Sequence, residues 1–135
     1  TRLLIKRLNK ELKLPILILT DADPWGMHIA RVIISGSVIS SHLPELATPD
    51  SKWIGIWPSD IKKYKLPSIP LNALDLHRIE TMKKDPRYNE KFWKENLEEF
   101  QRIKVKAELE AFSKYGLTAI INKYLIPKMK ELGFI

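Results

Sequence analysis

The chain has 135 residues, 44% of them hydrophobic, with no cysteine and a formal net charge of +7. Its length fits one domain with a real core, and the missing cysteines exclude disulfides and thiolate metal sites. No apolar run of membrane-spanning length and no signal-peptide pattern occur, which favours a soluble cytoplasmic protein, and the basic excess suits either a polyanionic partner or a merely solvated lysine-rich surface.

The N-terminal third predicts a helix followed by a buried strand. Apolar residues at helical spacing predict an amphipathic helix over residues 2–13, ending before Pro15. The uninterrupted apolar run 16–19 predicts a strand buried on both faces, as in a parallel sheet under covering helices. A helix over residues 25–35 follows, and a short apolar segment leads to His42 and a proline-containing loop.

A second strand is predicted over residues 52–57. The strand, helix, strand order indicates an α/β fold with a parallel crossover. Residues 58–71 contain three prolines around a basic cluster and predict a long ordered loop.

The remainder of the chain predicts helices. Asn72 is expected to cap a helix that runs to about Lys84. A helix with an apolar stripe is expected over residues 90–114, and a last helix over 118–132, which Pro127 should kink or split in two. The chain therefore divides into a strand and helix core, residues 1–71, and C-terminal helices, residues 72–135.

Two carboxylates stand at the end of the first predicted strand. Asp21 and Asp23 are two residues apart on an extended chain, so their side chains point the same way and can reach one cation. Ligands of parallel sheets bind beyond the carboxyl ends of the strands, and Mg²⁺ asks the protein for one or two carboxylates. On the residues alone, Asp23 is equally well explained as the cap of the following helix, with Pro24 in its first turn.

Residues 21–26, Asp-Ala-Asp-Pro-Trp-Gly, resemble the Asp-x-Asp motif of Toprim domains. The form is that of the A subunit of archaeal DNA topoisomerase VI and its meiotic double-strand-break relatives. Residues 53–60, Trp-Ile-Gly-Ile-Trp-Pro-Ser-Asp, and residues 104–112, Lys-Val-Lys-Ala-Glu-Leu-Glu-Ala-Phe, resemble the same family in the same order. The resemblance covers nearly the whole chain.

The resemblance implies a Toprim-like, Rossmann-like parallel sheet with flanking helices, and Mg²⁺ held by Asp21 and Asp23. It also implies the activity of an ATP-dependent type IIB topoisomerase, which makes and reseals transient DNA double-strand breaks. The implied partners are double-stranded DNA, a second copy of the A subunit, and the B subunit through parts outside this chain, and the implied location is the nucleoid.

In this family a tyrosine of a winged-helix domain attacks the DNA, and a further acidic residue lies on an earlier strand. Neither feature is visible in this sequence, and Glu11 does not match the acidic position. The sequence therefore predicts a partial Toprim domain over residues 1–135 from a longer protein, with poor metal affinity and no activity of its own. None of the four tyrosines is assigned as a nucleophile: Tyr64, Tyr88, Tyr115 and Tyr124.

Two other functions fit the same residues. One is a different Toprim protein, such as a nuclease or a primase, and the other is a non-catalytic module that binds DNA or docks a partner. Four more side chains are interpreted as structural. His28 could reach a phosphate, but it is better explained as packed or solvent-facing, and Asp60 is expected to cap the next turn or hold its loop. Glu108 and Glu110 are expected to form i, i+4 pairs with lysines on a helix.

Overall fold

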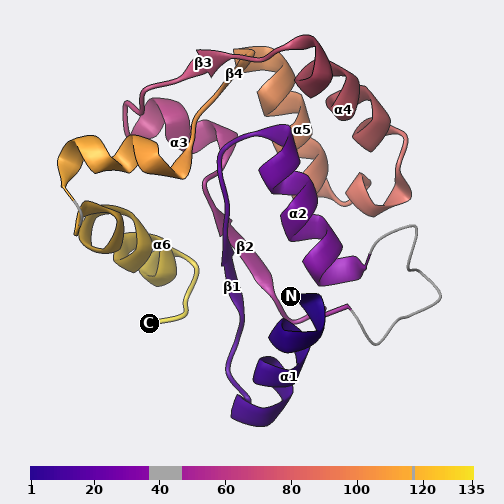
Figure 1. The fold of residues 1–135 in the computed structure, drawn as a ribbon, viewed down its shortest axis with the longest axis vertical. Coiled ribbons are helices and arrows are strands. Elements are labelled where there is room, and N and C mark those ends of the chain that lie inside the picture. The colour runs from indigo at the N-terminus through magenta and orange to yellow at the C-terminus, as the bar shows by residue number, and fades with distance from the viewer. Residues whose placement is uncertain (37–46, 117) are drawn as a thin grey trace.

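The computed structural model describes residues 1–36, 47–116 and 118–135. Figure 1 shows the order of the elements along the chain. They are α1 (Arg2–Leu12), β1 (Leu17–Leu19), α2 (Pro24–Ser35), β2 (Lys52–Gly55), α3 (Pro58–Lys63), β3 (Ile69–Pro70), α4 (Ala73–Lys83), the 3-10 helix η2 (Pro86–Tyr88), α5 (Lys91–Ile103), β4 (Val105–Lys106), the 3-10 helix η3 (Leu109–Tyr115), the π-helix η4 (Ile120–Leu125) and α6 (Ile126–Glu131).

The strands β1 and β2 pair in parallel, with α2 between them in the sequence. Ile18 lies opposite Trp53, and the register shifts before Leu19. The pairing continues past the strands, because Thr20 N–H donates to the Gly55 carbonyl at 2.8 Å. The predicted α/β fold with a parallel strand pair is confirmed, although β1 is less enclosed than expected, since Ile18 is buried and its neighbours are half-buried.

Helices cover both sides of this strand pair. In Figure 1, α2, α4 and α5 lie to the right of the strands, and α3 and α6 lie to their left. Each side has its own apolar cluster. The first includes Met27, Ile79, Trp93 and Phe100 around Ile18 and Trp53, and the second includes Ile56, Ile61, Phe112 and Tyr124.

Two predicted helices form because their caps are encoded locally. Asn72 accepts a hydrogen bond from Asp75 N–H at 2.9 Å, and Asp75 accepts one from Asn72 N–H, which completes a capping box at the start of α4. Pro24 starts α2 after the extended residue Asp23. Both helices match their predicted ranges to within one residue.

The helix predicted over residues 90–114 is wrong beyond Ile103. Lys104 adopts a left-handed backbone with φ 56°, and the chain then runs extended through β4. Extended residues here can pair with other segments: β4 pairs antiparallel with β3, and Ala107 exchanges two backbone hydrogen bonds with Ala22. These bonds replace the helical ones, and the apolar stripe resumes in η3.

The interpretation of residues 58–71 as loop is also wrong in part, because α3 begins at Pro58. Proline is favourable in the first turn of a helix, and Asp60 accepts a hydrogen bond from Trp57 N–H at 3.0 Å. Pro127 splits the last helix as predicted, with η4 before it and α6 containing it. The apolar segment predicted up to His42 lies outside the described residues.

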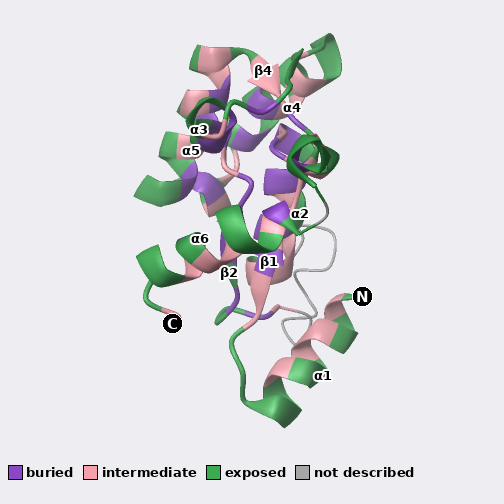
Figure 2. Ribbon diagram, turned by 90° about the vertical axis from the view of Figure 1, so that its left-hand side faces the viewer, coloured by how far each residue is buried: buried purple, intermediate pink, exposed green. Residues whose placement is uncertain are grey.

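The helix α1 forms as predicted but buries none of its residues. It lies apart from the other helices at the lower end of the molecule in both views (Figures 1 and 2). Its leucines Leu4, Leu8 and Leu12 remain exposed. The amphipathic pattern therefore predicts the helix correctly, while no other described part of the chain covers its apolar face.

Candidate functional site

Asp21 and Asp23 lie at the carboxyl end of β1, where the chain stays extended up to the start of α2. Between them, Ala22 N–H donates to the Ala107 carbonyl at 2.9 Å, and Ala107 N–H donates to the Ala22 carbonyl at 3.0 Å. This backbone bridge fixes the segment. The charge of Asp21 is among the causes that raise the pKa of Asp23, so the two carboxylates lie near each other.

A backbone N–H holds one oxygen of each carboxylate. Leu109 N–H donates to Asp21 Oδ1 at 2.6 Å, and Gly26 N–H donates to Asp23 Oδ1. In the described part of the chain, the second oxygen of each carboxylate accepts no hydrogen bond. Carboxylates that bind metals are commonly oriented by hydrogen bonds of this kind.

Asp23 serves as the cap of α2, as one of the two interpretations predicts. Burial is the main cause that raises its pKa above the ordinary 3.8, and the nearby carboxylates of Asp21 and Asp75 add to this rise, whereas the hydrogen bond from Gly26 and the charge of Lys106 oppose it. A carboxylate whose charge is disfavoured in this way gains from a bound cation. Because the cap uses Oδ1, it does not compete with a ligand role for Oδ2.

By themselves, Asp21 and Asp23 fit a hard cation whose remaining ligands do not come from the protein. Among the described residues, no group of three or more His, Cys, Asp or Glu side chains could hold a metal ion. Asp75 of α4 is close enough to raise the pKa of Asp23, but it is already paired with Lys106 at 2.7 Å. Mg²⁺ matches this donor set, since it keeps several waters and takes its remaining ligands from phosphate oxygens.

The start of α2 is packed closely against the end of the strand. A Cβ atom at Gly26 would lie 2.4 Å from the Asp21 carbonyl oxygen and 3.0 Å from Thr20 Oγ1. Residue 26 therefore has to be glycine for α2 to approach this closely. Gly26 N–H itself donates to the Asp23 carboxylate, the usual bond between a cap and the third residue of its helix.

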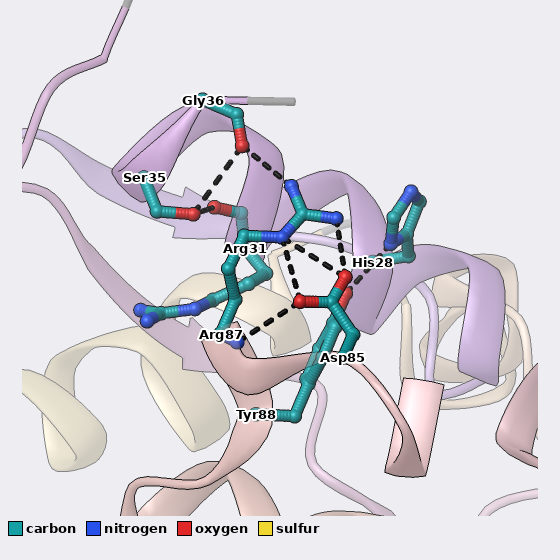
Figure 3. Close-up of polar contacts among 7 residues, drawn as sticks. All are labelled: His28, Arg31, Ser35, Gly36, Asp85, Arg87 and Tyr88. Atoms are coloured by element: carbon teal, nitrogen blue, oxygen red, sulfur yellow. Dashed lines mark hydrogen bonds and ion pairs between the residues drawn. The ribbon is translucent and has the colours of Figure 1, made fainter. Parts of the chain in front are cut away.

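His28 lies one turn further along α2 and is half-buried, consistent with the packed interpretation. Its Nδ1 lies 2.6 Å from Tyr88 Oη (Figure 3). Beside it, Arg87 donates to the Asp85 carboxylate and to the Gly36 carbonyl, which ties η2 to the end of α2.

The surroundings of His28 lower the pKa of its ring. Burial lowers its pKa below the ordinary 6.5, the charges of Arg87 and Arg78 lower it further, and Asp85 opposes them. The neutral ring is thus favoured in the folded state, so its contribution to stability is complete above about pH 6.5 and is lost as the pH falls toward the folded pKa. An NMR titration should give a His28 midpoint below 6.5, and Arg87→Met should raise it; a midpoint at or above 6.5 would contradict this assignment.

The structural interpretation of Asp60 is confirmed, with more partners than the sequence indicates. Asp60 is buried and accepts hydrogen bonds from Tyr124 Oη at 2.6 Å and from Lys128 Nζ at 3.1 Å. The i, i+4 pairs predicted for Glu108 and Glu110 are wrong, because no α-helix runs through these residues.

Three of the four tyrosines are poorly suited to act as nucleophiles. Burial is the main cause that raises the pKa of Tyr64, of Tyr88 and of Tyr124 above the ordinary 10. A tyrosine that holds its proton more firmly attacks less readily.

Similarity to known proteins covers nearly the whole chain. The family model for the Toprim domain of the topoisomerase 6 A subunit, which is shared with Spo11, matches residues 1–129. The chain is 48% identical over 133 residues to the A subunit of type 2 DNA topoisomerase 6 from Methanothermobacter thermautotrophicus, an alignment that covers 98% of this chain and 38% of that protein. The proteins of the same name from Archaeoglobus fulgidus and Haloarcula marismortui are 42% and 43% identical over 136 residues, with 100% of this chain covered in each case, and 38% and 37% of the relatives.

The chain therefore spans well under half the length of these relatives. In the described part of the chain, none of the helices has the length and apolar character needed to cross a lipid bilayer.

Proposed function

Because the chain belongs to the family of Toprim domains found in Spo11 and in the topoisomerase 6 A subunit, we propose that it is the Mg²⁺-binding part of the A subunit of an ATP-dependent type IIB DNA topoisomerase. Such an enzyme makes and reseals transient double-strand breaks. The observation that carries the proposal is the pair Asp21 and Asp23, each fixed by a backbone N–H through one oxygen.

The two aspartates would hold Mg²⁺ through their remaining oxygens. When bound, Mg²⁺ supplies Lewis-acid stabilisation of charge on phosphate oxygens. Asp21 and Asp23 would supply the protein ligands of this site, and an oxygen of the DNA phosphate would supply a further one. The half-buried position of both carboxylates keeps part of the surrounding water away, which strengthens their attraction for a cation.

The partners follow from the same proposal. Double-stranded DNA is the substrate, and a two-fold dimer of the A subunit would present one metal site to each strand. The B subunit would bind ATP and contact parts of its partner that lie outside this chain. The protein would work in the cytoplasm on nucleoid DNA.

A manganese titration followed by NMR tests the metal site. Mn²⁺ should broaden the backbone signals around residues 21–26, and Mg²⁺ should compete with it. Asp21→Asn and Asp23→Asn should each weaken the broadening by tenfold or more, since a neutral amide is a poor ligand for a hard cation. Both variants keep an oxygen that can accept the backbone hydrogen bond, and asparagine caps helices as well as aspartate does.

Asp50→Asn is the matched control, because Asp50 precedes β2 and lies at the opposite, amino end of the parallel pair. Equal broadening in all three variants would refute the metal site. Plasmid cleavage by the 135-residue chain, lost in Asp21→Asn, would instead favour a Toprim nuclease. DNA binding that ignores both Mg²⁺ and Asp21 would favour a docking module.

A further inference from the structure

An exposed aromatic surface begins next to the candidate metal ligands. Trp25 is the second residue of α2, directly after the cap formed by Asp23 and Pro24, and half of its surface is exposed. His28 lies one turn further on the same helix, with its ring centroid 5.7 Å from that of Trp25. These two rings form a continuous surface that starts within one helical turn of Asp23.

Arg78 of α4 lies across this surface. Its guanidinium carbon is 3.9 Å from the centroid of the Trp25 ring. Four other arginines each pair with a carboxylate: Arg7 with Glu11, Arg31 with Glu90, Arg87 with Asp85 and Arg102 with Glu99.

Arg78, in contrast, has no carboxylate within ion-pair distance in the ranges that the structure describes. It is half-buried, and one face of its guanidinium is covered by the indole ring. A guanidinium in this state keeps its N–H edge available for an anion. Its planar fork matches two oxygens of a phosphate.

The position of α4 directs Arg78 toward the same region as the aspartates. Asp75, one turn earlier on α4, is close enough to raise the pKa of Asp23 and also holds Lys106. Arg78 therefore follows Asp75 along the face of α4 that borders α2. Arg87 also lies near His28, but the Asp85 carboxylate with which it pairs offsets its charge there.

We propose that Arg78, held flat across Trp25, binds a phosphate of the DNA backbone beside the phosphate that completes the metal site. Trp25 acts as a positioning residue, because stacking fixes the guanidinium plane before DNA arrives and reduces the entropy lost on binding. The inference rests on the proposed function in one respect, that the ligand is double-stranded DNA.

The test is the affinity of the 135-residue chain for a short DNA duplex over a series of salt concentrations, in EDTA and again with Mg²⁺. In EDTA the metal site makes no contribution, so the measurement isolates Arg78. Arg78→Ala should weaken binding by about three- to tenfold at low salt and reduce the slope of log K against log salt by about 0.9, the share of one phosphate contact.

Two further variants separate position from charge. Arg78→Lys keeps the charge but loses the flat stacked fork, so its affinity should lie between those of the parent and Arg78→Ala. Trp25→Ala should reproduce much of the Arg78→Ala loss without changing net charge. Circular dichroism of each variant confirms that it is folded.

Arg7→Ala is the matched control, since it removes the same type of residue from the exposed surface of α1. It should leave the affinity within about twofold of the parent value. Equal losses for Arg7→Ala and Arg78→Ala, or an unchanged affinity for Trp25→Ala, would overturn the role of Arg78 while leaving the metal site intact. A parent chain that binds no duplex at any salt concentration would overturn both this inference and the proposed DNA substrate.

Discussion

Asp60→Ala is expected to cost about 3–5 kcal/mol of unfolding free energy, the loss typical of breaking a buried ion pair from one side. Asp60 and Lys128 are each about 1% exposed, and they join α3 to α6. The substitution leaves the Lys128 ammonium without its counter-charge and removes an acceptor from Tyr124 Oη and from Trp57 N–H. Since single domains are stable by only about 5–15 kcal/mol, urea unfolding should show a large fall in midpoint.

Two further variants test whether the loss comes from the unpaired buried charge. Glu95→Ala removes an acid from the exposed pair with Lys91 and should change stability by less than about 0.5 kcal/mol. The double change Asp60→Leu and Lys128→Met leaves no charge at this buried position and should recover most of the loss. A stable Asp60→Ala variant would mean that water or another group reaches Lys128.

Gly55→Ala is the second substitution with a large expected effect, about 3 kcal/mol or more. Gly55 has φ +147°, a backbone conformation that side chains disfavour. An added Cβ would also lie 1.7 Å from Tyr124 Oη and 2.7 Å from Tyr124 Cζ. The phenol cannot retreat easily, because its hydroxyl is bonded to Asp60 and to the Ile54 carbonyl.

Gly116→Ala is the comparison that separates the cost of backbone strain at a positive φ from the cost of the clash between the added Cβ and Tyr124. Gly116 also has a positive φ, +96°, but among the described residues a Cβ there would meet no atom within 4 Å apart from those of its chain neighbours. Thermal unfolding should therefore show a small loss for Gly116→Ala and a much larger one for Gly55→Ala. Similar losses at the two positions would mean that Tyr124 moves aside.

Elements with local signals were predictable from the sequence. The start of α4 is encoded by Asn72 and Asp75, which bond to each other, and the start of α2 by Asp23 and Pro24. The end of α5 has no such signal. Residues after Ile103 leave the helix because Ala107 pairs with Ala22, and no pattern near residue 104 reveals a partner so far away in the sequence.

In the candidate site, too, some features were predictable from the sequence and others depend on the fold. The spacing of Asp21 and Asp23 gives the pair, but the donor to Asp21 is a backbone N–H of residue 109, which carries no sequence signature. Lys128 looks like one more lysine in a lysine-rich chain, and its burial depends on the folded arrangement of α3, η4 and α6. Arg78 was hidden for a similar reason, since its contact with Trp25 joins two helices.

The hydrogen bond from Leu109 N–H to Asp21 couples the proposed metal site to η3. A cation that favours the oriented carboxylate also favours the docked position of η3, and by thermodynamic reciprocity a firmly docked η3 raises the affinity for the cation. Local opening of residues 109–115 would release one oxygen of Asp21 and weaken binding without any change at the aspartates. Metal affinity would thus report the cooperative stability of a segment that lies in the last quarter of the chain.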